Sequence, residues 1–88
     1  MKSEAREQRA AEITAYVAGY HDREGLSPTY REIQAALDLS SSSVAGYWVR
    51  VAVDLGYLRP PVTVRARSLR VSDKGREAIE GMDIHAHV

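Results

Sequence analysis

Residues 25–50 have the sequence GLSPTYREIQAALDLSSSSVAGYWVR, which predicts two short helices joined by a tight polar turn. Thr29 is a favourable N-cap for the first helix, and Glu32, three residues later, completes a capping box. Pro28 keeps the chain extended before the cap, so this helix is expected to begin abruptly. Residues 38–40 interrupt the apolar pattern and form the predicted turn. The stretch therefore predicts a helix-turn-helix.

The second helix of this pair is expected to be capped by Ser41 and to run to about Leu55, because Gly56 can end it. At about 100° per residue, one side carries apolar residues centred on Ala45 and Val49. The other side is small and polar, and it carries Ser43, Gly46, Tyr47, Arg50 and Asp54. Such a face suits insertion into a major groove, where side chains must reach base edges.

Gly46 is unusual because a glycine within a helix costs about 1 kcal/mol relative to alanine. Close approach of the helix backbone to a nucleic-acid partner is one explanation, and the one we favour. Close packing against another helix of the same chain is the alternative.

Residues 25–41, followed by Leu55-Gly-Tyr-Leu58, resemble the N-terminal DNA-binding domain of LexA-type repressors. The resemblance extends over most of residues 13–71 and implies a winged helix-turn-helix whose recognition helix, residues 41–55, reads operator DNA in the major groove. It assigns the base-reading positions to Ser41, Ser43, Val44, Gly46 and Tyr47. LexA itself carries acidic and amide residues there, so the resemblance implies DNA binding but not the same operator.

A cationic segment follows the helix-turn-helix. The formal net charge of the chain is +0, yet residues 59–76 contain six basic residues and one acidic residue, a net charge of +5. Within it, residues 59–71 are expected to form a two-stranded wing, with Arg65 and Arg67 near its tip placed to meet phosphates or a minor groove. A solvated run of charge is the alternative. The complete predicted DNA-binding set is Thr29, Tyr30, Arg31, Ser41, Ser42, Ser43, Val44, Gly46, Tyr47, Arg50, Arg65 and Arg67.

The flanking segments complete the predicted fold, which is mostly α with a small β-hairpin. Residues 4–23 carry an apolar stripe at helical spacing, and residues 57–59 and 69–71 read as antiparallel strands. Residues 72–80, with Ser72 as N-cap, resemble the closing helix of MarR- and PadR-like winged helices. We expect one winged helix-turn-helix domain over residues 1–83, with a three-helix core, a two-stranded wing, a short C-terminal helix and a flexible tail at 84–88.

Several classes of protein are disfavoured. The chain has no cysteine for disulfides or thiolate metal sites, and no apolar run of the roughly 20 residues that span a bilayer. The serines at 40–43 have no partner at a catalytic spacing, and neither a glycine-rich phosphate loop nor a paired-carboxylate motif is present. No stretch is long enough to be the self-cleaving domain of LexA. We therefore expect a cytoplasmic, nucleoid-associated protein that is not an enzyme and needs no metal or cofactor.

Two functions remain open. The favoured one is a sequence-specific transcriptional regulator, a repressor, that binds double-stranded DNA as a homodimer; its small size is typical of phages or mobile elements. The alternative is a winged-helix adaptor that contacts a protein partner in a transcription or replication complex, which the zero net charge and Tyr47-Trp48 favour.

Overall fold

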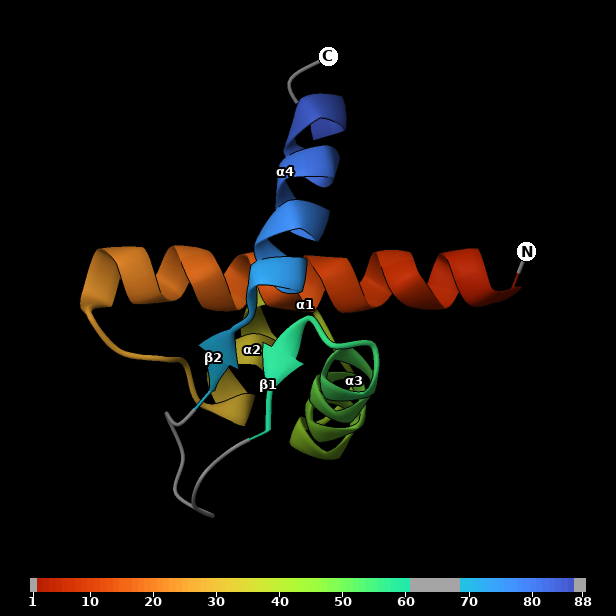
Figure 1. The fold of residues 1–88 in the computed structure, drawn as a ribbon. Coiled ribbons are helices and arrows are strands. Elements are labelled where there is room, and N and C mark those ends of the chain that lie inside the picture. The colour runs from red at the N-terminus through yellow and green to blue at the C-terminus, as the bar shows by residue number, and fades with distance from the viewer. Residues whose placement is uncertain (1, 61–68, 87–88) are drawn as a thin grey trace.

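The computed structural model describes residues 2–60 and 69–86, with the backbone alone described for residues 2–4 and 82–86. The first helix is long. The second and third helices and the two strands lie on one side of it, and the last helix projects from its other side (Figure 1). The elements are α1 (Lys2–Glu24), α2 (Tyr30–Ala36), α3 (Ser42–Asp54), β1 (Leu58–Arg59), β2 (Arg70–Val71) and α4 (Asp73–Ala86). The predicted order of helices and strands is confirmed.

Side-chain caps fix the starts of α2 and α3. The Thr29 hydroxyl accepts a hydrogen bond from the Glu32 amide at 3.1 Å, and the Thr29 amide donates to the Glu32 carboxylate at 2.8 Å. The Ser41 hydroxyl accepts from the Val44 amide at 3.2 Å. These bonds satisfy amides that lack partners within the helix, so the predicted capping box and the Ser41 cap are both confirmed.

The turn between α2 and α3 is a Schellman motif. The Leu39 amide donates to the Gln34 carbonyl at 2.9 Å, and the Asp38 amide donates to the Ala35 carbonyl at 3.4 Å. Asp38 occupies the left-handed region, with φ of 55°, where glycine is the usual residue and aspartate is tolerated. This turn brings α3 back against α2.

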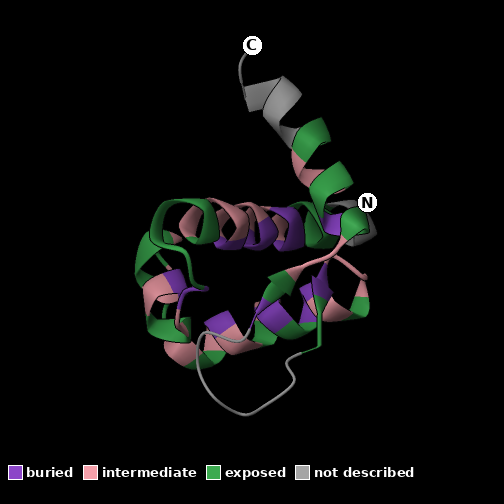
Figure 2. Ribbon diagram, turned by 60° about the vertical axis from the view of Figure 1, so that its left-hand side comes forward, coloured by how far each residue is buried: buried purple, intermediate pink, exposed green. Residues whose placement is uncertain are grey.

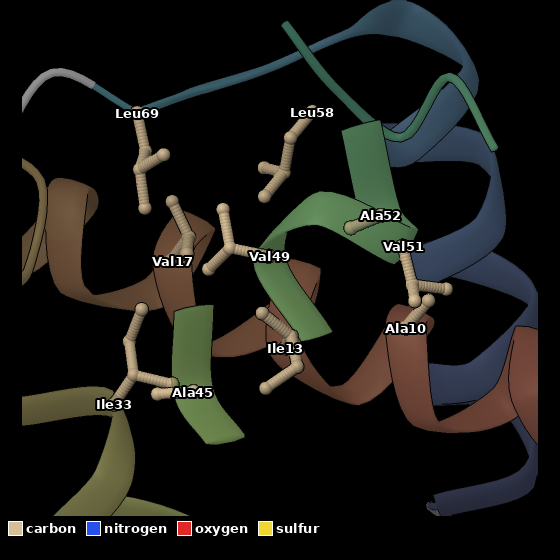
Figure 3. Packing of buried hydrophobic residues seen from close by; sticks show 10 residues of the cluster. All are labelled: Ala10, Ile13, Val17, Ile33, Ala45, Val49, Val51, Ala52, Leu58 and Leu69. Atoms are coloured by element: carbon tan, nitrogen blue, oxygen red, sulfur yellow. The ribbon is translucent and has the colours of Figure 1, made fainter. Parts of the chain in front are cut away.

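The hydrophobic core lies where α1 faces α2, α3 and the hairpin. Ile13 and Val17, one helical turn apart on α1, are almost completely buried and point toward α3 (Figure 3). Ile33 from α2 and small residues of α3 fill the space between the helices. The cluster consists of Ala10, Ile13, Val17, Ile33, Ala45, Val49, Val51, Ala52, Leu58 and Leu69.

The hairpin is attached to this core at its base. Leu58 of β1 lies opposite Val71 of β2, and Leu69 and Leu58 are both buried while Arg70 is exposed. This is the predicted alternation of a half-buried strand. The Leu69 amide donates to the buried Ser27 hydroxyl at 3.2 Å, which ties the hairpin to the loop before α2.

The start of α4 packs tightly on the residues before β1. The Ser72 hydroxyl accepts from the Gly75 amide at 3.0 Å, which confirms the predicted N-cap. The Ser72 hydroxyl also lies within hydrogen-bonding distance of the Gly56 and Tyr57 carbonyls, and the Ser72 amide donates to the Tyr57 carbonyl at 3.0 Å. Gly75 is buried against the same carbonyl, where a β-carbon would overlap it.

The end of α4 corrects the sequence prediction. We expected the helix to end near residue 80, but α4 continues to Ala86. The predicted flexibility of residues 84–88 stays a prediction. No proline follows Ser72 to stop the helix, and Gly81 lies within it. Beyond its first turn, α4 is exposed or half-buried up to residue 81 (Figure 2). In the described part of the chain, no helix combines the length and apolar character needed to cross a membrane.

Candidate nucleic-acid interface

The two sides of α3 differ sharply in burial. Ala45, Val49 and Ala52 are buried toward α1 and the hairpin. The opposite side exposes Ser43, Tyr47, Arg50 and Asp54. The predicted division of this helix into an inward and an outward side is therefore confirmed, and α3 is held by its apolar side while its polar side faces solvent.

A groove runs along the outward side of α3, between this helix and the start of α2. Tyr30, which is 41% exposed, and Tyr47, which is 56% exposed, both line this groove together with Gly46. A β-carbon at Gly46 would lie 3.4 Å from the Tyr30 ring, so helix α2 covers part of this glycine. We call this feature the tyrosine groove; its volume is about 560 Å³ and it is lined by Tyr30, Gly46, Tyr47, Val49, Arg50, Val53 and Asp54.

The tyrosine groove joins four of the predicted binding residues with three that the prediction omitted. Tyr30, Gly46, Tyr47 and Arg50 were predicted from the sequence, whereas Val49, Val53 and Asp54 were not. Asp54 follows Arg50 by one helical turn, so helical spacing could have identified it. Val49 is a core residue and Val53 packs against the core, and both border the groove only because α2 packs on α3.

The Tyr47 ring is supported by its neighbour. Its centroid lies 5.2 Å from that of Trp48, and the two rings meet edge to face at 78°. Trp48 is itself half-buried and packs against the core cluster. The Tyr47 ring is therefore exposed to solvent and is held in place by its contact with Trp48.

The other predicted residues near α2 and α3 divide into exposed groups and structural ones. Arg31 is exposed beside Tyr30, while Ser42 and Val44 are half-buried. The hydroxyls of Thr29 and Ser41 accept the capping hydrogen bonds, so their first role is to position the two helices.

The carboxylate of Glu32, in the first turn of α2, is held by hydrogen bonds within the protein. The Glu32 carboxylate accepts from the Tyr20 hydroxyl at 3.0 Å as well as from the Thr29 amide.

Burial of the Tyr16 side chain, and secondly the negative charge of Glu32, raise the pKa of Tyr16 above its ordinary value. Arg31 and Arg50, in contrast, are exposed to solvent and available to a negatively charged partner.

The hairpin supplies further cationic groups at its base. Arg59 and Arg70 lie opposite each other in the antiparallel register, and both are exposed. The predicted contacts of Arg65 and Arg67 lie outside the described residues.

A capped helix-turn-helix, followed by an antiparallel hairpin and a closing helix, defines a winged helix-turn-helix protein. The chain is similar to the LexA repressors of Lactobacillus johnsonii and Lactobacillus gasseri, each 35% identical over 78 residues. That similarity covers 88% of this chain but 37% of each relative, so the chain spans just over a third of the length of these proteins. The resemblance to LexA-type repressors is thus confirmed. No family model matches the chain, and no solved structure matches it significantly.

Proposed function

We propose that this chain is a sequence-specific regulator of transcription that binds double-stranded DNA and acts as a repressor. The observation that carries the proposal is the exposed outward side of α3, which holds Ser43, Tyr47 and Arg50 on a helix whose other side is buried. A rigidly held helix of this kind can enter a major groove and contact base edges without unfolding any part of the core.

The shape of α3 favours entry by its N-terminal half. Ser43 and Gly46 are small, so the helix is narrow where it would enter a groove. Tyr47 and Arg50 come later in the helix and have longer side chains that can extend to the base edges. An arginine can donate two hydrogen bonds to a guanine edge. The start of α2, with Tyr30 and Arg31 exposed, then lies beside the phosphate backbone.

The hairpin of β1 and β2 acts as the wing in this proposal. Arg59 and Arg70 at its base, with Arg65 and Arg67 between them in the sequence, give this region its positive charge. Their role is to contact phosphates or a minor groove, which positions α3 but specifies little sequence.

We further propose that the protein acts as a homodimer at DNA in the cytoplasm and catalyses no reaction. One short recognition helix contacts only a few base pairs, and two copies on adjacent half-sites provide the affinity and specificity that a regulator needs. The names of the two relatives, which are repressors, support the regulatory role.

Selection from a pool of randomised DNA duplexes tests the proposal. The purified chain is expected to enrich one sequence motif and to bind the enriched duplex, measured by fluorescence anisotropy, with an affinity that falls steeply as salt is added. Arg50→Ala is expected to weaken this binding, whereas Arg76→Ala removes a charge that is also exposed but lies on α4, and it is expected to change the binding little. Absence of binding even at low salt would overturn the proposal.

A protein-binding adaptor is the second candidate. The zero net charge and the exposed rings of Tyr30 and Tyr47 favour it, because aromatic residues are enriched at protein interfaces. In that case the same groove would bind a protein, and the anisotropy experiment would show no DNA affinity at any salt concentration.

A further inference from the structure

Two exposed arginines of the hairpin extend from the same face of it. Arg59 of β1 and Arg70 of β2 lie directly opposite each other in the antiparallel register. Opposite residues of such a pair have side chains on one face of the sheet, with Cβ atoms about 4.5–5.5 Å apart. The neighbouring pair, Leu58 and Val71, extends from the other face, where both residues pack with the core. The two arginines, which we call the arginine pair, therefore lie side by side on the solvent face.

The arginine pair has no carboxylate beside it to offset its charge. In the part of the chain that the structure describes, neither guanidinium group forms an ion pair, and their one hydrogen bond runs from Arg70 Nη1 to the Leu69 carbonyl at 3.5 Å. The sequence has no aspartate or glutamate between Asp54 and Asp73. Like charges directly opposite each other destabilise a strand pair, and a bound anion would remove that repulsion.

The chemistry of the arginine pair selects an anion with several acceptor oxygens. Guanidinium groups carry positive charge and only hydrogen-bond donors, so they repel cations and leave their donors unsatisfied against an apolar group. A phosphate matches them, because its oxygens accept paired N–H bonds from arginine. We propose that Arg59 and Arg70 together hold one phosphate group of the DNA backbone, a proposal that rests on the proposed function. Both arginines thus contact the same phosphate at the base of the wing.

Neutral phosphate analogues in the DNA test this assignment. In the duplex selected by the wild-type chain, each backbone phosphate is replaced in turn by a methylphosphonate, which removes its negative charge. At one phosphate of each half-site, the replacement is expected to lower the affinity of the wild type roughly three- to tenfold. In Arg59→Gln and in Arg70→Gln the loss at this same phosphate is expected to shrink, and in the double variant it is expected to vanish.

The salt dependence of binding distinguishes one shared phosphate from two separate ones. The slope of log affinity against log salt is about −0.9 for each phosphate contacted. With a shared phosphate, each single variant retains nearly the wild-type slope, and the double variant loses about one unit. A loss of about one unit in each single variant and about two in the double would overturn the shared contact. Arg76→Gln is the matched control, because it removes an exposed arginine from α4, and it is expected to retain the wild-type slope.

A measurement without DNA tests whether the arginine pair also binds free phosphate. Inorganic phosphate is compared with chloride at equal ionic strength in thermal unfolding. It is expected to raise the midpoint of the wild type by about 1–4 °C more than that of the Arg59→Gln/Arg70→Gln double variant. Arginine-dependent sensitivity to methylphosphonate without this stabilisation identifies the DNA backbone as the only source of the phosphate.

The outcomes separate this proposal from the proposed function. If the wild type binds its selected duplex but the two single variants lose sensitivity at different phosphates, or at none, the shared contact is overturned and DNA recognition stands. If no duplex is bound at low salt but phosphate stabilises the wild type more than the double variant, the proposed function fails and the arginine pair holds a free phosphate. Absence of both effects overturns both proposals.

Discussion

Replacement of Gly75 by alanine is expected to be strongly destabilising. A β-carbon at this position would overlap the Tyr57 carbonyl oxygen and lie 3.0 Å from both the Tyr57 carbonyl carbon and the Val71 Cγ1 atom. Favourable carbon–carbon contacts are about 3.5–4.0 Å, so the start of α4 must move away from Tyr57. Two of the three groups involved belong to the backbone, which cannot rotate aside as a flexible side chain would.

The size of the effect follows from what that movement disrupts. Overpacking costs about 1–3 kcal/mol, and weakening the two contacts from Ser72 to the Tyr57 carbonyl costs about 1 kcal/mol each. The better helix propensity of alanine offsets at most about 1 kcal/mol. The free energy of unfolding is therefore expected to fall by about 2–4 kcal/mol, from a total of about 5–15 kcal/mol for a typical domain.

Urea denaturation, followed by far-ultraviolet circular dichroism and by Trp48 fluorescence, measures this change. Gly81→Ala is the matched control, because it makes the same substitution on the same helix in open space and is expected to stabilise by up to about 1 kcal/mol. If the free energy of unfolding of Gly75→Ala lies within about 0.5 kcal/mol of the wild-type value, the close packing of α4 on Tyr57 is refuted.

Three further predictions concern stability and use the same urea assay. Asp38→Gly is expected to raise the free energy of unfolding by about 0.5–1 kcal/mol, because it relieves a left-handed residue and removes a negative charge at the C-terminal end of α2; a loss of stability would contradict this. Ser27→Ala is expected to cost about 1–3 kcal/mol, because the Leu69 amide loses its buried acceptor, and an unchanged midpoint would show that the bond contributes nothing. Tyr16 has a pKa raised above 10.0, chiefly by burial, so its stabilising effect is complete below pH 10.0 and is lost as the pH rises through the folded-state value. Tyr16→Phe should therefore lose less stability than the wild type on going to strongly alkaline pH, and equal losses would exclude Tyr16 as the cause.

Local signals in the sequence predicted most of the fold. The caps at Thr29, Ser41 and Ser72 depend on residues at most three positions apart, and all three were identified correctly. Gly25 and Gly56 adopt positive φ at the ends of α1 and α3, where glycine is expected. Helical spacing also separated the buried and exposed sides of α3. These features are determined by neighbouring residues and hence can be inferred without knowledge of the tertiary structure.

Long-range packing accounts for what the sequence left open. The Tyr30 ring of α2 lies against Gly46 of α3, so packing within the chain accounts for part of the burial of this glycine. A methyl group would still fit there, so packing alone does not require glycine. The need for Gly75 depends on the Tyr57 carbonyl, eighteen residues earlier in the chain. The length of α4 was underestimated, because α4 continues through Gly81 to Ala86 although glycine often follows the end of a helix.

The most direct test of the central claim is a map of the residues that contact DNA. Amide chemical shifts of the isotopically labelled chain, recorded before and after addition of the selected duplex, provide that map. The largest changes are expected at Ser43, Gly46, Tyr47 and Arg50, with smaller ones at the start of α2 and little change over residues 76–81 of α4. Changes concentrated on α4 or on the outer side of α1, with the outward side of α3 unaffected, would contradict the assignment of α3 as the recognition helix.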